Sequence, residues 1–192
     1  MKFFSAALAI IIFTVTLSSC SAEETAVVEN EDYVTAAAPA EGWDWEQLTS
    51  LMYINGVQLS YPFSVSDLGR GYILGELGAG NYYVGGIVYV GNSQLFSVRY
   101  YIEDVSEFED ITLETEAAGL MFSSSVNTSD IPDEELFSVN GITLGSTIGE
   151  VEDMMGYPNS VSGNAYMYNV GETGIEFDFT DDIVSLINVY WE

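Results

Sequence analysis

Apolar and acidic residues alternate near the end of the chain, over residues 175–179. The odd positions are isoleucine or phenylalanine, and the even positions are glutamate or aspartate. Successive side chains of a strand point to opposite faces, so this segment predicts a strand with one buried and one solvated face, as in an antiparallel sheet. Two aspartates then turn the chain into a last apolar strand over residues 183–191.

Helical signals come before these strands. Thr147 and Glu150 have the spacing of a capping box. The three large apolar residues within 151–155 fall on one face at helical spacing. Gly156 and Pro158 mark the end of the segment, since glycine favours the helix C-cap and proline stops continuation. A short helix is therefore predicted to cover the C-terminal strands.

The first half of the chain has weaker patterns. Residues 81–102 predict two strands joined by a tight turn at Gly91-Asn92. Residues 111–115 predict a further strand, and residues 64–69 predict a helical turn with serine caps. Residues 46–53 fit a short helix or a strand equally well.

A short internal repeat relates the two halves. Residues 54–59 (INGVQL) and 139–144 (VNGITL) share an Asn-Gly turn between apolar residues and a leucine three positions after the glycine. The fold class predicted is α+β: an antiparallel sheet with short helices on one face, in a single domain over residues 43–192. The repeat suggests two tandem βα-βββ-like halves, at about 43–122 and 136–192.

The N-terminal segment has the composition of an export signal. Lys2 is the only charged residue before Cys20, and residues 3–17 are almost entirely apolar. This run is shorter than the roughly 20 apolar residues that a bilayer-spanning helix needs. Residues 20–42 are acidic and lack sustained periodicity, which predicts a flexible, extended tether.

The end of this leader resembles the bacterial lipobox, an aliphatic residue and two small residues before a cysteine. The residues are Leu17-Ser18-Ser19-Cys20. The resemblance implies a signal peptide over residues 1–19 that is removed, and a diacylglycerol on the sulfur of Cys20, with palmitate-type chains. It also implies a lipoprotein held on the extracytoplasmic side of the cell membrane. An ordinary secretory leader with a chance cysteine is the alternative.

Charge and missing residue types exclude several functions. The chain has 30 acidic and three basic residues, so cleavage before Cys20 leaves only Arg70 and Arg99 and a net charge of −28. Nucleic-acid binding needs a basic surface and is excluded. Histidine is absent and Cys20 is the only cysteine, which excludes triads that use histidine, histidine-based zinc sites and disulfides. We therefore assign no catalytic, cofactor-binding or metal-binding residue.

Two acidic clusters leave weak calcium binding open as an alternative to solvated loops, because calcium takes six to eight oxygen ligands. Neither cluster has the spacing of an EF-hand loop. The clusters comprise Asp178, Asp181 and Asp182, and Asp130, Asp133, Glu134 and Glu135.

The second half resembles the small lipoprotein modules related to the outer-membrane assembly lipoprotein and the β-lactamase-inhibitor protein. The resemblance rests on residues 144–158, with their strand–helix opening, and on the strands at 175–179 and 184–189. Residues 65–68 of the first half look like the companion half of clostridial-type lipoproteins of unknown function. These residues are structural, so the resemblance implies a fold and no site.

These observations favour a non-enzymatic, lipid-anchored binding or scaffold module that recognises an envelope or extracellular protein. Its partners would be the membrane, through the lipid on Cys20, and an unknown envelope protein. One alternative is a cell-wall hydrolase that uses two carboxylates. An inhibitor of another enzyme, by fold analogy, is the other.

Overall fold

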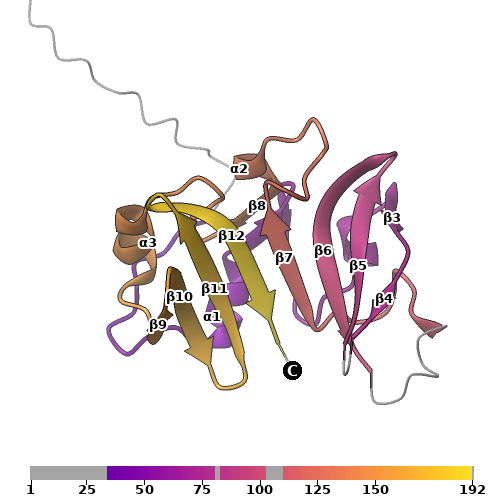
Figure 1. Cartoon of the computed structure of the whole chain (residues 1–192). Helices are drawn as coiled ribbons and strands as arrows, with labels where there is room; N and C mark the ends of the chain where they lie inside the picture. The colour runs from indigo at the N-terminus through magenta and orange to yellow at the C-terminus, as the bar shows by residue number, and fades with distance from the viewer. Residues whose placement is uncertain (1–33, 81–82, 103–109, 192) are drawn as a thin grey trace, which may run out of the picture. The chain divides into compact units, whose positions relative to one another are not determined.

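The structure is a computed structural model that describes residues 34–80, 83–102 and 110–191 (Figure 1). Antiparallel strands dominate it, and its helices are short, so the predicted α+β class is confirmed. In chain order the elements are α1 (Trp45–Ser50), β1 (Met52–Ile54), β2 (Val57–Gln58), the 3-10 helix η1 (Val65–Leu68), β3 (Tyr72–Leu74), β4 (Gly78–Ala79), β5 (Tyr83–Val90), β6 (Ser93–Tyr101), β7 (Gly119–Ser123), α2 (Asp133–Leu136), β8 (Phe137–Val139), α3 (Ile148–Met155), β9 (Ser160–Ser162), β10 (Ala165–Val170), β11 (Thr173–Thr180) and β12 (Ile183–Tyr190).

The large sheet has the strand order β3-β5-β6-β7-β12-β11-β10-β9, and β4 pairs with β5 at one edge. The first half of the chain supplies β3 to β7, and the second half supplies β9 to β12. The last strand of each half lies in the middle, where β7 and β12 pair antiparallel (Figure 1). The order of the strands is therefore mirrored about this central pair.

The small sheet has the order β2-β1-β8, and in it one strand from each half, β1 and β8, pair antiparallel. Tyr53 in β1 lies opposite Ser138 in β8, 85 positions later. The Asn55 N–H donates to the Leu136 carbonyl at 2.9 Å, and the Asn140 N–H donates to the Leu51 carbonyl at 2.9 Å. Each donor and each acceptor also has its counterpart 85 positions away, so the predicted repeat corresponds to an approximate two-fold axis through this strand pair.

Both Asn-Gly turns adopt the same unusual backbone. Asn55 and Gly56 have φ of 47° and 75°, and Asn140 and Gly141 have 49° and 81°. Left-handed φ at both central positions is what a type I′ hairpin turn requires, and asparagine followed by glycine tolerates it best. The repeated dipeptide is thus explained by the turn that it forms.

Each half also has a capped helix behind its strands. In α3, Glu150 Oε2 accepts from the Thr147 backbone N–H at 2.7 Å, and the Glu150 N–H donates to Thr147 Oγ1 at 3.3 Å. At η1, Asp67 Oδ2 accepts from the Ser64 backbone N–H at 2.7 Å. Gly69 follows η1 with a φ of 95°, which ends it after four residues.

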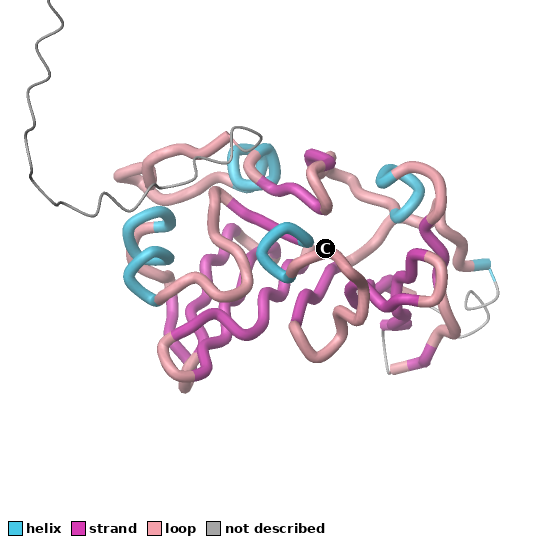
Figure 2. Tube along the Cα trace, turned by 90° about the horizontal axis from the view of Figure 1, so that it is seen from above, coloured by secondary structure: helices cyan, strands magenta, loops and turns pink. Residues whose placement is uncertain are grey.

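One face of the large sheet is buried and the other is left open. Burial alternates along β5 and β11, as the period of a strand dictates. Figure 2 shows the helices on one side of the large sheet, as predicted. On that side Phe122 of β7 stacks on Phe137 of β8, with ring centroids 4.1 Å apart. Both side chains are fully buried, and burial of each contributes about 1.5–3 kcal/mol.

The predicted strand at residues 111–115 is wrong. The Thr115 N–H donates to the Thr112 carbonyl at 3.2 Å, and the Thr112 N–H donates to Thr115 Oγ1 at 2.8 Å. Local threonine hydrogen bonds thus close a turn in place of a strand ladder. The strand that pairs with β6 and β12 is β7, which the sequence did not indicate because only three apolar residues lie between Gly119 and Ser123.

Residues 34–42, which fall in the predicted tether, lie against the domain, and we call them the strap. The Ala36 N–H donates to Asn140 Oδ1 at 2.7 Å, and Asn140 Nδ2 donates to the carbonyls of Ala36 (2.8 Å) and Met154 (2.9 Å). Asn140 is fully buried, so these bonds tie the strap down before Trp43. The signal peptide, Cys20 and the tether up to residue 33 lie outside the described residues.

Candidate functional site: the open face of the large sheet

The open face consists of the side chains that point away from the helices. One row of paired residues crosses six strands of it, from β10 through β11, β12, β7 and β6 to β5, and its members are partly exposed. The row comprises Met167, Glu176, Asn188, Met121, Ser97 and Ile87. This surface mixes apolar, amide and charged groups, as protein interfaces do.

Three side chains of this face form a hydrogen-bonded polar chain. Arg99 Nη2 in β6 donates to Asn188 Oδ1 in β12 at 3.0 Å. Asn188 Nδ2 donates to Glu176 Oε2 in β11 at 3.0 Å. The amide therefore links the guanidinium to the carboxylate and fixes the orientation of both groups.

The polar chain depends on a glycine. Arg99 must pass over β7 to reach β12, and it does so at Gly119. A Cβ at position 119 would lie 3.0 Å from Arg99 Nη2 and 2.8 Å from the Val189 carbonyl oxygen. Only a residue without a side chain leaves room for the guanidinium there.

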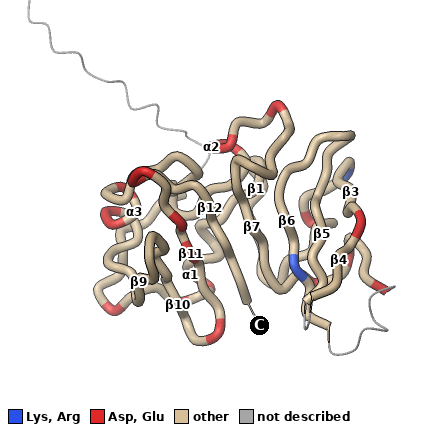
Figure 3. Tube along the Cα trace, in the orientation of Figure 1, with Lys and Arg blue, Asp and Glu red and all other residues tan. Residues whose placement is uncertain are grey.

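Electrostatics at this face follow the acidic balance of the chain. Burial, and then the neighbouring Glu176, raise the pKa of Asp178. Burial, and then Glu176, also raise the pKa of Tyr190, which Arg99 opposes. In Figure 3 acidic residues are spread over the loops, the helices and β11, while a basic residue lies on β6. Arg99 therefore supplies positive charge to an otherwise acidic surface.

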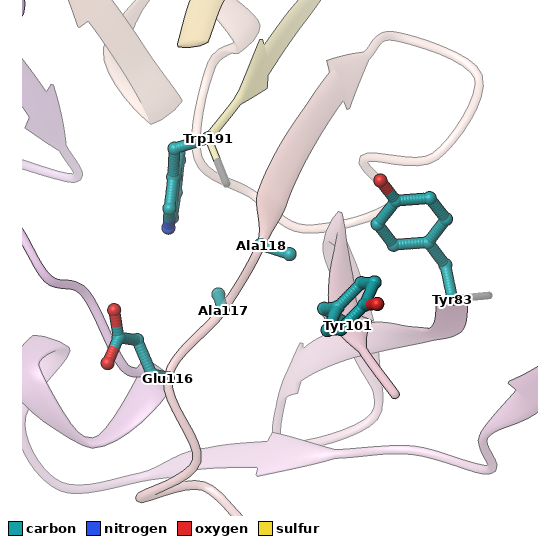
Figure 4. A pocket seen from close by; sticks show the side chains of 6 residues that line it. All are labelled: Tyr83, Tyr101, Glu116, Ala117, Ala118 and Trp191. Atoms are coloured by element: carbon teal, nitrogen blue, oxygen red, sulfur yellow. The ribbon is translucent and has the colours of Figure 1, made fainter. Parts of the chain in front are cut away.

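An aromatic pocket of about 450 Å³ opens where β5 begins and β6 ends. Its lining residues are Tyr83, Tyr101, Glu116, Ala117, Ala118 and Trp191 (Figure 4). Tyr83 and Tyr101 are cross-strand partners with centroids 5.9 Å apart in a T-shaped arrangement. The Arg99 guanidinium lies 5.9 Å from the Tyr83 ring centroid, which places the pocket beside the polar chain.

Further aromatic rings pack against Trp191 without lining the pocket themselves. Tyr61 packs edge-on against Trp191 at 6.1 Å and against Trp45 at 6.1 Å. Tyr61 is 42% exposed and Tyr101 is 56% exposed. Aromatic side chains of this size contribute much of the binding energy in protein interfaces.

Two other cavities lie away from the open face. One of about 380 Å³ lies between the strap and the end of α3, beside Tyr157. Another of about 650 Å³ lies beside α1 and β2 and includes Trp45, Gln58 and Tyr61. Neither contains the residues of the polar chain.

The acidic residues singled out from the sequence are only partly brought together. Asp178 lies on β11, whereas Asp181 and Asp182 form the turn to β12 with φ of 53° and 65°. Asp133 Oδ1 accepts from Asn127 Nδ2 at 2.8 Å and so closes its own loop. Within the described segments, no group of three or more metal-ligating side chains could hold a metal ion. Calcium binding stays a prediction.

Sequence reasoning missed the polar chain and the pocket. The sequence offered one indication that Arg99 has a role, because it is one of two basic residues after the leader and interrupts an apolar strand. Its partner Asn188 is 89 positions later, and nothing local indicates that pairing. Glu116 had no signal at all among the 30 acidic residues.

Among the described residues no helix is both long and apolar enough to cross a membrane. No protein-family model, no curated protein and no solved structure matches this chain. The resemblance to the outer-membrane assembly lipoprotein and β-lactamase-inhibitor modules therefore stays a prediction.

Proposed function

We propose that this chain is a lipid-anchored binding module on the extracytoplasmic side of the cell membrane, whose open face recognises an envelope or extracellular protein. The observation that carries the proposal is the polar chain of Arg99, Asn188 and Glu176 on a sheet face that the helices leave uncovered. The lipobox-like residues before Cys20 support the anchor.

Preorganisation supports a role in recognition. The guanidinium of Arg99 is oriented by Asn188 and lies near the ring of Tyr83, so it loses little freedom on binding. Arginine, tyrosine and methionine are enriched in protein interfaces, and Met121 lies at the centre of the same face. A rigid sheet face of this kind presents its side chains in fixed register.

Charge supports a basic partner. The net charge of −28 after cleavage attracts a positively charged surface over several ångströms and accelerates encounter. The same field weakens with salt, with a screening length of about 10 Å at 0.1 M. Contacts at the open face would then supply the part of the affinity that survives salt.

The test is affinity capture from envelope extract with the mature chain, at low and high salt. Met121→Arg places a positive charge at the centre of the open face, whereas Tyr157→Arg makes the same charge change outside it, on a side chain that is 89% exposed. We expect one protein to be retained at both salts and at least a tenfold loss of affinity for Met121→Arg alone. Equal effects of the two variants, or capture only at low salt, would contradict the proposal.

One observation favours a carboxylate-based hydrolase as a second function. Glu176 and Asp178 lie two residues apart on the same face of β11, and the pKa of Asp178 is raised. Neither side chain lines the three cavities described above, which weakens this alternative. Cell-wall fragments released by the mature chain, and not by Asp178→Asn, would support it.

A further inference from the structure

We infer that the aromatic pocket accepts a cationic side chain, lysine or arginine, from the partner protein. This inference rests on the proposed function, because it assigns the chemistry that the partner presents. The pocket combines aromatic rings, an apolar floor and one carboxylate within about 450 Å³. Cavities of this size hold drug-sized ligands, so a lysine or arginine side chain has room to enter.

The arrangement of the pocket fits a side chain with an apolar stem and a charged end. Ala117 and Ala118 separate two parts of the pocket, with the tyrosine pair on one side and Trp191 and Glu116 on the other (Figure 4). The methyl groups of the alanines suit a methylene stem. The aromatic rings suit a cation, since the negative face of a ring attracts positive charge.

Glu116 supplies the anionic group, and its backbone is held on both sides. Glu116 forms a β-bridge with Ser64, and the next residue, Ala117, donates its N–H to the Phe63 carbonyl at 2.8 Å. The Glu116 side chain itself is exposed. The carboxylate is thus positioned at the pocket, and within residues 34–80, 83–102 and 110–191 no hydrogen bond or ion pair uses it.

Arg99 does not fill this pocket, although it lies near Tyr83. Its Nη2 is held by Asn188 at 3.0 Å, and it is not among the residues that line the cavity. Asn188 in turn donates to Glu176, so a carboxylate lies at the other end of the same polar chain. The surplus negative charge of the chain then makes the pocket favourable for a cation and unfavourable for an anion.

The experiment follows the alanine methyl signals of the isotopically labelled mature chain by NMR. The probes are Nα-acetyl-lysine methylamide, the arginine equivalent, and the uncharged norleucine and acidic glutamate equivalents. We expect saturable, millimolar shifts of Ala117 and Ala118 with the lysine or arginine probe, and at least tenfold weaker binding of norleucine. The glutamate probe should not bind.

Glu116→Gln should weaken binding of the cationic probe about tenfold, while the shape of the side chain is kept. Glu114→Gln is the matched control, because Glu114 is exposed in the same loop and does not line the pocket. Unchanged spectra of the other alanines would show that both variants fold. Equal weakening in both variants, equal binding of norleucine, or no saturable shift would overturn the inference.

This outcome is separable from that of the proposed function. Partner capture that depends on Met121 but persists in Glu116→Gln, with no probe binding, would overturn the inference about the pocket. The proposed binding module would stand. Probe binding at the pocket without any captured protein would support the pocket and count against the protein partner.

Discussion

Two buried tyrosines should differ in how the stability of the protein responds to loss of their hydroxyl group. Tyr100 of β6 is fully buried, and no residue in the described part of the chain forms a hydrogen bond with its hydroxyl. Tyr168 of β10 is 3% exposed, and its hydroxyl donates to the Gly156 carbonyl at 2.8 Å. Phenylalanine at each position removes one oxygen and keeps the ring.

The magnitudes follow from the state of each hydroxyl. Burial of an unpaired polar group costs about 1–3 kcal/mol, and burial raises the pKa of Tyr100 to about 12. We expect Tyr100→Phe to leave the free energy of unfolding unchanged or to raise it by about 1 kcal/mol. Tyr168→Phe breaks a hydrogen bond at the end of α3, so it should lower that free energy by about 0.5–1.5 kcal/mol.

Urea and thermal unfolding of the mature chain measure both changes. One kcal/mol corresponds to a shift of about 2–4 °C in Tm for a domain of this size, and the urea m value should stay constant. The double variant should show the sum of the two effects if the sites are independent. A Tyr100→Phe variant that loses as much stability as Tyr168→Phe would refute the reasoning.

Three further substitutions test the open face and the strap by unfolding. Gly119→Ala places a Cβ against the Val189 carbonyl and the Arg99 guanidinium, so it should cost about 1–3 kcal/mol. Asp178→Asn should stabilise the protein at neutral pH. The raised pKa means that the folded state holds the proton more tightly, so stability falls as pH rises through the folded pKa, and the gain should vanish below about pH 3.9, the ordinary aspartate pKa. Asn140→Asp should cost about 3 kcal/mol or more, because a buried carboxylate would face the two carbonyls that the amide now binds.

Each of these changes has a matched control. Gly85→Ala, on β5 opposite Arg99, meets only an ordinary contact of 3.8 Å and should change stability by less than about 0.5 kcal/mol. Asp153→Asn makes the same charge change on the exposed side of α3 and should not reproduce the pH profile. Asn55→Asp lies at the repeat-related turn, where the side chain is exposed, and should cost less than about 1 kcal/mol. If a control variant changed stability as much as the substitution it is paired with, the structural explanation given for that substitution would be wrong.

The sequence predicted elements where local chemistry decides the structure. The capping box at Thr147, the Asn-Gly turns and the alternation over residues 175–179 are all satisfied within a few residues, and each is found. Residues 111–115 are also locally determined, but by threonine hydrogen bonds that their strand-like alternation of apolar and polar residues does not reveal.

Features that depend on distant residues could not be predicted. The strap is held by Asn140, which lies more than 100 positions from Ala36. The acidic composition of residues 20–42 gives no sign of this contact. Likewise Gly119 has a role only because Arg99 crosses it to reach Asn188. Such contacts depend on which strands become neighbours in the sheet. A short sequence motif does not carry that information.

Each half of the chain, taken alone, would expose two strand edges that are paired in the whole chain. Residues 136–192 would expose one edge of β12 and one edge of β8, which now pair with β7 and β1. A second copy of the same fragment could supply a partner for both edges, because β7–β12 and β1–β8 are both antiparallel pairs, as equivalent strands are about a two-fold axis. The protein thus has the architecture of a fused dimer, and expression of one half is expected to give a symmetric homodimer. Fusion into one polypeptide lets the copies diverge, so that one half supplies most of the aromatic pocket and the other carries the helix against which the strap lies.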